Sequence, residues 1–423
     1  MIIFGVMFQF RICPPKGPWP MPPWCASEFI KYQYEVNVSP LPLTQIKAVN
    51  MYDTWGRNYN MNMVETTQAN IEESFARVAS LGAQEIYIHD FDRAIYDKEA
   101  DFTSLNYQLA DEIFLNDMRD ESISVSDLKI LVAAAHNRGL KLGIKRNISF
   151  VNIGKYISDG FKGNISGAVS SDYKKFNESH SEDWINDYFQ KWQKRLLEKG
   201  KIYQEAGVDI MSISPSFQEP TFAGHEKLAN EQRNKLITEL RQVFKGKIMA
   251  DLNVYGFIDG RNGSEDWTKY DYYKKVDIVE VKIYSIPEKY WDKGDYSRGN
   301  MEKAISSMTA DLDKMAEKLG VKISIFYAPS SYKNGLLRGP VEFLDVKNPA
   351  IMSLEKDYEE QVLAFDYFFK SVKDKKNIER LNAANFAWDD ALDPEVKPRI
   401  SVSAGFRNKP AEAVIGAWWT AKY

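Results

Sequence analysis

This sequence lacks a large excess of either positive or negative charge, and it lacks long apolar segments. Its 423 residues carry a formal net charge of −4 and a pI of about 5.8, so the charge predicts neither a nucleic acid nor an anionic membrane as partner. No segment has the roughly 20 apolar residues that a membrane-spanning helix needs. Residues 1–10 are apolar but too short, and they lack a basic start and a small-residue cleavage site. They fit either a signal-sequence remnant or a first buried strand.

Cysteine is nearly absent, because the chain has only Cys13 and Cys25. Both lie at the ends of a proline- and tryptophan-rich run, residues 13–25, and prolines at this density block helix and strand alike. The run is therefore predicted to be a stiff irregular loop. A disulfide across it fits an exported protein, and two free thiols are the alternative.

Two catalytic motifs are missing as well. No predicted strand is followed by the glycine-rich phosphate turn of dinucleotide-binding folds. Ser212, Ser214 and Ser216 stand close together, but no Gly-X-Ser-X-Gly turn surrounds them. The sequence therefore argues against a serine nucleophile of the hydrolase type.

Histidine is also rare, with four in the chain. His89 adjoins Asp90 and Asp92, which is a set of side chains that can hold a metal ion. No second cluster of this kind occurs in the sequence. We therefore expect neither a metal site nor another cofactor.

Aromatic residues are plentiful, at 13% of the chain with 10 tryptophans and 23 tyrosines. Such a surplus usually fills a core. It also suits saccharide-binding clefts, where flat rings stack on the apolar faces of sugars. Trp55, Tyr284, Tyr327 and Trp388 all follow or end predicted strands, and together they favour a ring-lined cleft.

Strand and helix patterns alternate along most of the chain. The predicted strands are residues 45–52, 83–89, 140–147, 208–216, 247–253, 277–284, 321–327 and 380–388. The predicted helices are residues 67–81, 124–138, 181–205, 226–244, 266–274, 301–319, 355–373 and 408–419, with insertions at 98–122 and 150–180.

Eight strands alternating with about as many helices predict an α/β fold of the (β/α)₈ TIM-barrel type. A doubly wound open sheet is the alternative, and the missing phosphate turn argues against it. We expect the barrel domain at residues 41–423 and a Pro/Trp-rich N-terminal extension at residues 1–40.

Four segments resemble the clan A glycoside hydrolases, and most closely glycoside hydrolase family 113, which contains barrel β-mannanases. Ile46-Lys-Ala-Val, with Trp55 after it, resembles the first strand of that family, and Leu140-Lys-Leu-Gly-Ile-Lys145 resembles the third. Val279 to Tyr284 resembles the sixth strand, where a tyrosine closes the strand.

The tail is similar to the terminal helix of such barrels, through Arg407-Asn-Lys-Pro-Ala-Glu-Ala-Val and the following Trp418-Trp419. The four matches occur in the family's order and extend over about residues 45–420. The resemblance implies a TIM barrel that acts on carbohydrate.

The resemblance also implies an acid/base glutamate at the end of strand four and a nucleophilic glutamate at the end of strand seven. In this sequence Ser216 stands at the first position, and Ala328 or Pro329 stands at the second. Classical retaining hydrolysis with that pair of glutamates is therefore excluded on this alignment.

Other carboxylates follow neighbouring strands. Asp251 on strand five and Glu280 on strand six approach each other if both face the barrel interior, because adjacent strands lie about 4.8 Å apart. We predict this pair as the catalytic residues. The alternative is a satisfied polar core in which Glu280 pairs with Lys282 or Asp251 pairs with Lys145. Glu219 is a further candidate acid, with a solvated loop position as its alternative.

The predicted saccharide-binding residues share positions at or near strand ends. They are Trp55, Lys145, Asn147, Asn253, Tyr284, Trp388 and Asp389. Asp389 and its neighbour Asp390 serve either as hydrogen-bonding groups for sugar hydroxyls or as caps of the next segment.

The sequence thus predicts an extracellular or cell-surface glycoside hydrolase that acts on a poly- or oligosaccharide through non-standard carboxylates. The alternative is a non-catalytic barrel that binds glycan or serves as a structural surface protein. A carbohydrate is the expected partner in both cases.

Overall fold

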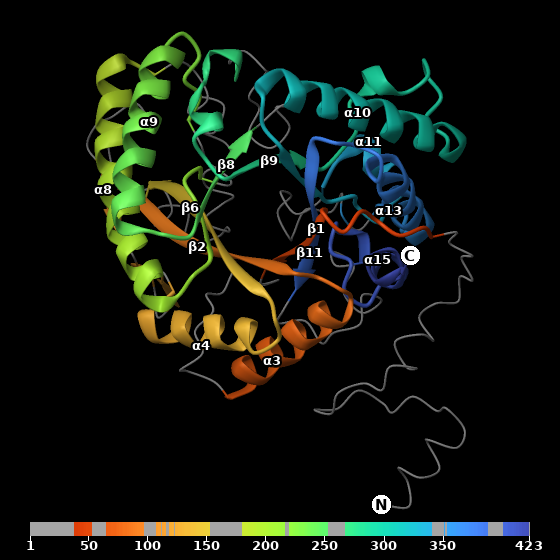
Figure 1. Cartoon of the computed structure of the whole chain (residues 1–423), viewed down its shortest axis with the longest axis horizontal. Coiled ribbons are helices and arrows are strands. Elements are labelled where there is room, and N and C mark those ends of the chain that lie inside the picture. The colour runs from red at the N-terminus through yellow and green to blue at the C-terminus, as the bar shows by residue number, and fades with distance from the viewer. Residues whose placement is uncertain are drawn as a thin grey trace, which may run out of the picture.

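The computed structural model describes residues 38–52, 65–96, 107–110, 112–115, 118–121, 123–152, 180–215, 220–252, 267–340, 351, 353–387 and 401–422. The predicted N-terminal extension, with Cys13 and Cys25, lies almost wholly outside these residues. Within them, strands form a closed cylinder and helices surround it (Figure 1).

The barrel consists of eight parallel strands, each hydrogen-bonded to two neighbours in the order β1-β11-β10-β9-β8-β7-β6-β2, with β1 pairing back onto β2. The strands are β1 (Ile46–Tyr52), β2 (Glu85–Tyr96), β6 (Lys141–Asn152), β7 (Ile210–Ser212), β8 (Lys247–Leu252), β9 (Ile278–Ile283), β10 (Ile323–Tyr327) and β11 (Ile378–Ala387). The predicted (β/α)₈ barrel is confirmed.

The helices lie outside the strands, and most match the predicted ranges within a few residues. They are α3 (Glu65–Ser80), α4 (Val125–His136), α8 (Glu182–Ala206), α9 (Glu226–Val243), α10 (Arg298–Leu319), α11 (Gly335–Arg338), α13 (Tyr358–Val372) and α15 (Pro410–Thr420). The predicted helix at 266–274 is instead two 3₁₀ turns, η1 (Trp267–Lys269) and η2 (Tyr272–Lys274), and a third, η3 (Glu288–Tyr290), follows β9.

Side-chain caps set the start of two of these helices. Ser124 accepts a hydrogen bond from the backbone N–H of Asp127, and Ser181 accepts one from Trp184. Each cap satisfies a backbone donor that the first helical turn leaves unpaired. Helix α8 ends at Gly207, whose φ of 84° is a left-handed conformation that glycine adopts without strain.

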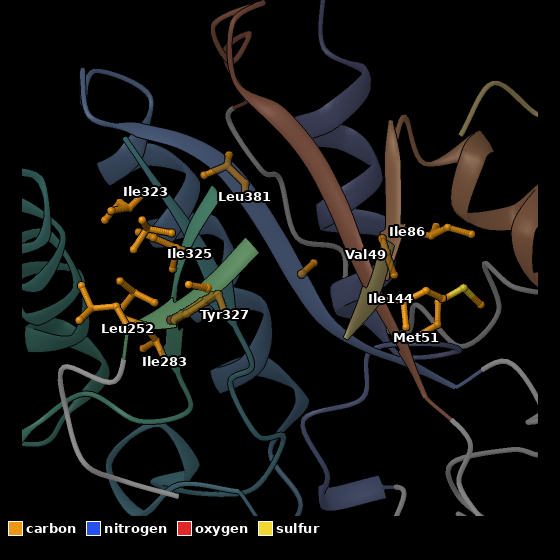
Figure 2. Packing of buried hydrophobic residues seen from close by; sticks show 14 of the residues in the cluster. Val49, Met51, Ile86, Ile144, Leu252, Ile283, Ile323, Ile325, Tyr327 and Leu381 are labelled. Carbon is orange, nitrogen blue, oxygen red and sulfur yellow. The ribbon is translucent and has the colours of Figure 1, made fainter. Parts of the chain in front are cut away.

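The apolar core lies between the strands and the helices. Side chains on the outer faces of the strands fill this layer from opposite sides of the barrel, including Val49, Ile144, Ile283 and Leu381 (Figure 2). All four are buried. This layer contains most of the buried apolar surface of the domain, so the strands hold the helices in place by hydrophobic contact.

The inner faces of the strands meet inside the barrel, and the ring of Tyr87 packs among the side chains there. Tyr87 on β2 lies opposite Gly143 on β6, within a small apolar cluster that includes Ile210 and Met249. A Cβ atom on Gly143 would lie 2.4 Å from Cδ1 of Tyr87. The ring therefore occupies the space that a side chain at position 143 would need.

Strands β2 and β6 extend about five residues or more beyond the predicted ranges, and β7 is much shorter than predicted. Strand β2 continues through Asp90 and Asp92 to Tyr96, and it stays in register with β6 as far as Asn152. Strand β7 covers only Ile210–Ser212, because few backbone hydrogen bonds join it to β6 and β8.

The predicted insertion at 98–122 contains three short antiparallel strands, β3 (Tyr107–Ala110), β4 (Glu112–Leu115) and β5 (Met118–Glu121). Strand β3 pairs with the far end of β2. Most of the second predicted insertion, residues 153–179, lies outside the described residues.

The close approach of Tyr87 to Gly143 yields a stability prediction. Gly143→Ala should lower the free energy of unfolding by about 1–3 kcal/mol, because the added methyl group overfills the barrel interior. Chemical denaturation monitored by circular dichroism measures this change.

Gly299→Ala is the matched control, since its added Cβ would meet only Ser297 Oγ at 3.7 Å in the first turn of α10. Alanine in a helix is favoured over glycine by about 1 kcal/mol, so this variant should be as stable as the wild type or more so. Equal stability of the two variants would contradict the close approach.

Candidate functional site

The interior of the barrel is unusually polar above the Tyr87 ring. Side chains alternate between the two faces of a strand, so every second residue points inward. The buried inward-facing polar residues are Asn50, His89, Lys145, Ser212, Ser214, Asp251, Glu280, Ser324 and Asn382. Charged groups removed from water in this way need partners, because an unpaired buried charge is strongly unfavourable.

Glu280 makes the central ion pair of this interior. Its Oε1 atom accepts a very short hydrogen bond from Nζ of Lys145, and both side chains are completely buried. Its Oε2 atom accepts from Asn382 at 2.8 Å and from Ser324 at 3.2 Å. Burial lowers the pKa of Lys145, an effect that the negative charges of Glu280 and Asp251 oppose. Each oxygen of Glu280 thus has at least one donor.

Asp251 and Lys282 form a second ion pair closer to the carboxyl ends of the strands. Nζ of Lys282 lies 2.5 Å from Oδ2 of Asp251. The side chains are 8% exposed for Asp251 and 11% exposed for Lys282. Neither carboxylate oxygen of Asp251 has a hydrogen-bond partner of good geometry among the described residues. Asp251 is therefore the less fully coordinated of the two carboxylates.

The predicted proximity of Asp251 and Glu280 agrees with the strand register, in which they are paired residues of β8 and β9. The expected alternative pairings, Glu280 with Lys282 and Asp251 with Lys145, do not occur. Instead Lys145 binds Glu280 and Lys282 binds Asp251. Two lysines therefore neutralise two neighbouring carboxylates, so the four groups together carry no net charge.

His89 faces the same interior from β2. Its Nε2 atom lies 3.2 Å from Oδ1 of Asn50, and Asn50 donates a hydrogen bond to Asn385. Burial holds the pKa of His89 well below its usual value, and the positive charges of Lys145 and Lys282 lower it further. The imidazole is therefore neutral at physiological pH.

His89 does not group with the neighbouring Asp90 and Asp92. Because β2 continues past His89, the two aspartates point outward toward α8 and the histidine points inward. Asp90 accepts a hydrogen bond from Tyr203, and Asp92 accepts one from Arg195 at 2.8 Å.

Arg146 lies between the two aspartates and donates to both. This network joins β2 and β6 to helix α8. Among the described residues, no group of three or more histidine, cysteine, aspartate or glutamate side chains is arranged to hold a metal ion.

The aromatic residues near the strand ends separate into two groups. Tyr284 faces inward at the end of β9, is 5% exposed, and contacts Phe326 with ring centroids 5.3 Å apart. Tyr327, which we expected at the rim, points outward and stacks on Phe368 of α13 at 4.3 Å. The expectation for Tyr327 was wrong because alternation along β10 turns Phe326, not Tyr327, toward the interior.

Several predicted site residues lie outside the described part of the chain. They are Trp55, Asn253, Trp388 and Asp389, together with the strand-four position Ser216, the candidate acid Glu219 and Asp390. Asn147 is described only as part of strand β6. The roles of these residues in binding saccharide stay predictions.

Sequence reasoning missed several residues of this interior, among them Asn50, Ser324 and Asn382. Each lies an even number of residues from another inward-facing side chain, as Asn382 does from Arg380. Polar residues at every second position of an otherwise apolar strand were the available signal.

No family model matches this chain, and no curated protein matches its sequence. Solved structures do match its fold. One GH113 β-1,4-mannanase superimposes with a TM-score of 0.57 and 12% identity, over 89% of this chain and 99% of the other. A GH113 β-mannanase from Alicyclobacillus acidocaldarius gives a TM-score of 0.54 and 13% identity, over 92% and 99% of the two chains.

This chain has the barrel fold of GH113 β-mannanases. The resemblance seen in the sequence is thereby confirmed for the fold. The strand-seven position expected to carry a glutamate is described, and Ala328 and Pro329 are both buried there. No helix among the described residues has the length and apolar character needed to cross a membrane.

The ion pair of Lys145 and Glu280 yields a second prediction. Glu280→Gln should lower the free energy of unfolding by about 3–5 kcal/mol, because it leaves the Lys145 ammonium buried without an opposite charge. Glu288→Gln, in an η3 turn whose residues are not buried, should change stability by less than about 0.5 kcal/mol.

Chemical denaturation at pH 7 measures both values. If the two substitutions had equally small effects, Lys145 would have to be neutral or hydrated in the folded protein.

Lys199 of α8, which lies beside Asp90 of β2, yields a prediction about how stability depends on pH. Burial lowers the pKa of Lys199 to about 8 from 10.5, although Asp90 lies 3.7 Å away and opposes the shift. Between these two pH values the unfolded chain holds more protons on Lys199 than the folded chain does. The free energy of unfolding must therefore rise with pH in this window.

Relative to Lys199→Met, the wild type should gain about 3 kcal/mol between pH 8 and pH 10.5. Denaturation curves at several pH values measure this difference. For Lys201→Met, at an exposed position of the same helix, the free energy of unfolding should change with pH as it does in the wild type. A difference between wild type and Lys199→Met that falls with pH would contradict the lowered pKa.

Proposed function

We propose that this chain is a carbohydrate-active barrel that binds a poly- or oligosaccharide at the carboxyl ends of its strands. Barrel enzymes carry out their chemistry at that end, because the loops that follow the strands assemble there. The likeness to GH113 β-mannanases supports this choice of ligand class. An extracellular or cell-surface location, where such polymers occur, is part of the proposal.

We further propose that the protein hydrolyses its saccharide as a glycoside hydrolase with non-standard carboxylates. The observation that supports this is Asp251, a buried side chain near the carboxyl end of β8 whose carboxylate oxygens lack a hydrogen-bond partner among the described residues and whose register partner is Glu280. Most glycoside hydrolases need two carboxylates flanking the scissile bond. In the proposal Asp251 and Glu280 supply them, and substrate replaces the ammonium of Lys282 at Asp251.

The further substrate contacts in this proposal come from residues around the same end of the barrel. They are Trp55, Asn147, Asn253, Tyr284, Trp388 and Asp389. Lys145, which the sequence also predicted to bind saccharide, would act through Glu280 instead, since it is completely buried against that carboxylate.

A second candidate function is non-catalytic glycan binding or a structural role at a surface. The observation that favours it is the pairing of both interior carboxylates with lysines. A carboxylate bound by a lysine ammonium group can contact a substrate only if that ion pair is broken, and breaking a buried ion pair is costly. The second function is also favoured by Ser216 and by Ala328 or Pro329, which stand where the family has its two catalytic glutamates.

Release of reducing ends from a panel of poly- and oligosaccharides, including β-1,4-mannan, tests the hydrolytic proposal. The wild type should release product from at least one of them. Asp251→Asn should lower that rate by about 100-fold or more, as expected for loss of a group that transfers protons or attacks the substrate. Asp311→Asn, at an exposed position of α10, is the charge-matched control and should keep the full rate.

Glu280→Gln is assayed beside these variants, with its stability measured so that unfolding is not mistaken for lost chemistry. Binding of the same panel is measured by affinity electrophoresis. Binding of a glycan without release of any product would reject hydrolysis and support the second function. Full activity in both Asp251→Asn and Glu280→Gln would show that the proposed pair is wrong.

A further inference from the structure

A cavity of about 310 Å³ lies at the amino-terminal end of the barrel, opposite the end that carries Asp251. It is lined by the turn that precedes β1, by Lys322 just before β10, and by residues 373–376, which join α13 to β11. Strands β1, β11 and β10 are neighbours in the sheet. Three segments far apart in the sequence therefore meet at this cavity.

The cavity is strongly basic. Four lysines line it, namely Lys322, Lys373, Lys375 and Lys376. Within the described residues, one of these ammonium groups makes a side-chain contact: Nζ of Lys373 donates to Ser39 Oγ at 3.3 Å. The positive charge is therefore available to a ligand.

Two acidic residues, Asp374 and Glu379, also line the cavity. Glu379 is already bound to Arg380, with 3.1 Å between the carboxylate and the guanidinium. Four lysines against two carboxylates leave an excess of two positive charges at this place, in a chain whose net charge is −4. This locally positive charge on a chain that is negative overall favours an anionic ligand.

The lysines are not needed to bind the backbone carbonyl groups at the end of α13. The last carbonyls of α13 are occupied by other donors, since Phe369 accepts from the backbone N–H of Lys373 and Val372 accepts from Gln45 and from the N–H of Lys375. The ammonium groups are therefore not needed to satisfy this end of the helix.

Gln45 adds a second, independent feature. Its side chain lines the cavity and is 3% exposed, and its Nε2 donates to two backbone carbonyls. Its Oε1 has no hydrogen-bond partner among the described residues. Through its two donated hydrogen bonds, the amide of Gln45 fixes the turn before β1 against the end of α13 and the start of β11, which holds two segments of the cavity wall together.

We propose that this cavity binds a small phosphate-bearing ligand. Phosphate has the charge and the several acceptor oxygens that a group of lysine ammonium groups binds well. This site lies at the end of the barrel away from the proposed saccharide site, so it does not depend on that proposal.

Isothermal titration calorimetry at fixed ionic strength tests the site with three probes. Inorganic pyrophosphate tests the charge alone, a hexose 6-phosphate tests charge with hydroxyl groups, and the unphosphorylated hexose tests hydroxyl groups alone. At least one of the two charged probes should bind at this site, and the free hexose should not. The tighter of the charged probes shows whether hydroxyl groups contribute.

The double variant Lys373→Gln/Lys376→Gln should weaken binding by about tenfold or more, which corresponds to about 1.4 kcal/mol. Thr44→Glu, at an exposed position on the cavity wall, should weaken it without removing a lysine. Lys227→Gln, at an exposed position of α9, is the matched control and should stay within about twofold of the wild type.

Asp251→Asn should leave binding of these probes unchanged, which separates this site from the proposed saccharide site. Absence of binding by both charged probes would overturn the proposal. Equal affinities in the lysine double variant, in Thr44→Glu and in Lys227→Gln would also overturn it, because binding would then reflect the overall surface charge.

Discussion

Pairing of buried charges is the constraint on which the centre of this barrel depends. Lys145 and Glu280 are completely buried on strands from different parts of the barrel. Either charge alone would be strongly unfavourable in that position. Their contact, with the hydrogen bonds from Asn382 and Ser324, therefore fixes the relative positions of β6, β9, β10 and β11.

The same constraint shapes the candidate site. Asp251 and Glu280 are adjacent across β8 and β9, and two like charges so close together repel each other. Lys145 and Lys282 remove that repulsion by binding one carboxylate each. In the proposed hydrolysis, substrate has to displace Lys282 from Asp251, so the ion pair that stabilises the interior opposes the proposed reaction.

Much of the fold was predictable from sequence, because it follows from local patterns. Apolar periodicity located the eight strands and most of the helices within a few residues. The interior was harder to predict, because it depends on where each strand ends and which face each residue takes. Because β2 continues past His89, its side chains keep alternating, and Asp90 and Asp92 lie on the opposite face from His89. The same alternation along β10 places Tyr327 outside the barrel. Pairing of particular lysines with particular carboxylates depends on contacts between distant strands, which periodicity does not encode.

The ring of Tyr87, held against Gly143, separates two charged layers of the barrel. The Lys145 ammonium lies 5.2 Å from the ring centroid, and the Tyr87 hydroxyl donates to Glu85, which binds Arg380. The ring and the apolar side chains packed around it therefore form an uncharged layer between the two ion pairs. Each charged layer is neutralised by its own residues, Lys145 with Glu280 in one and Arg380 with Glu85 in the other. The two layers are thus separate electrostatic units stacked in one cylinder.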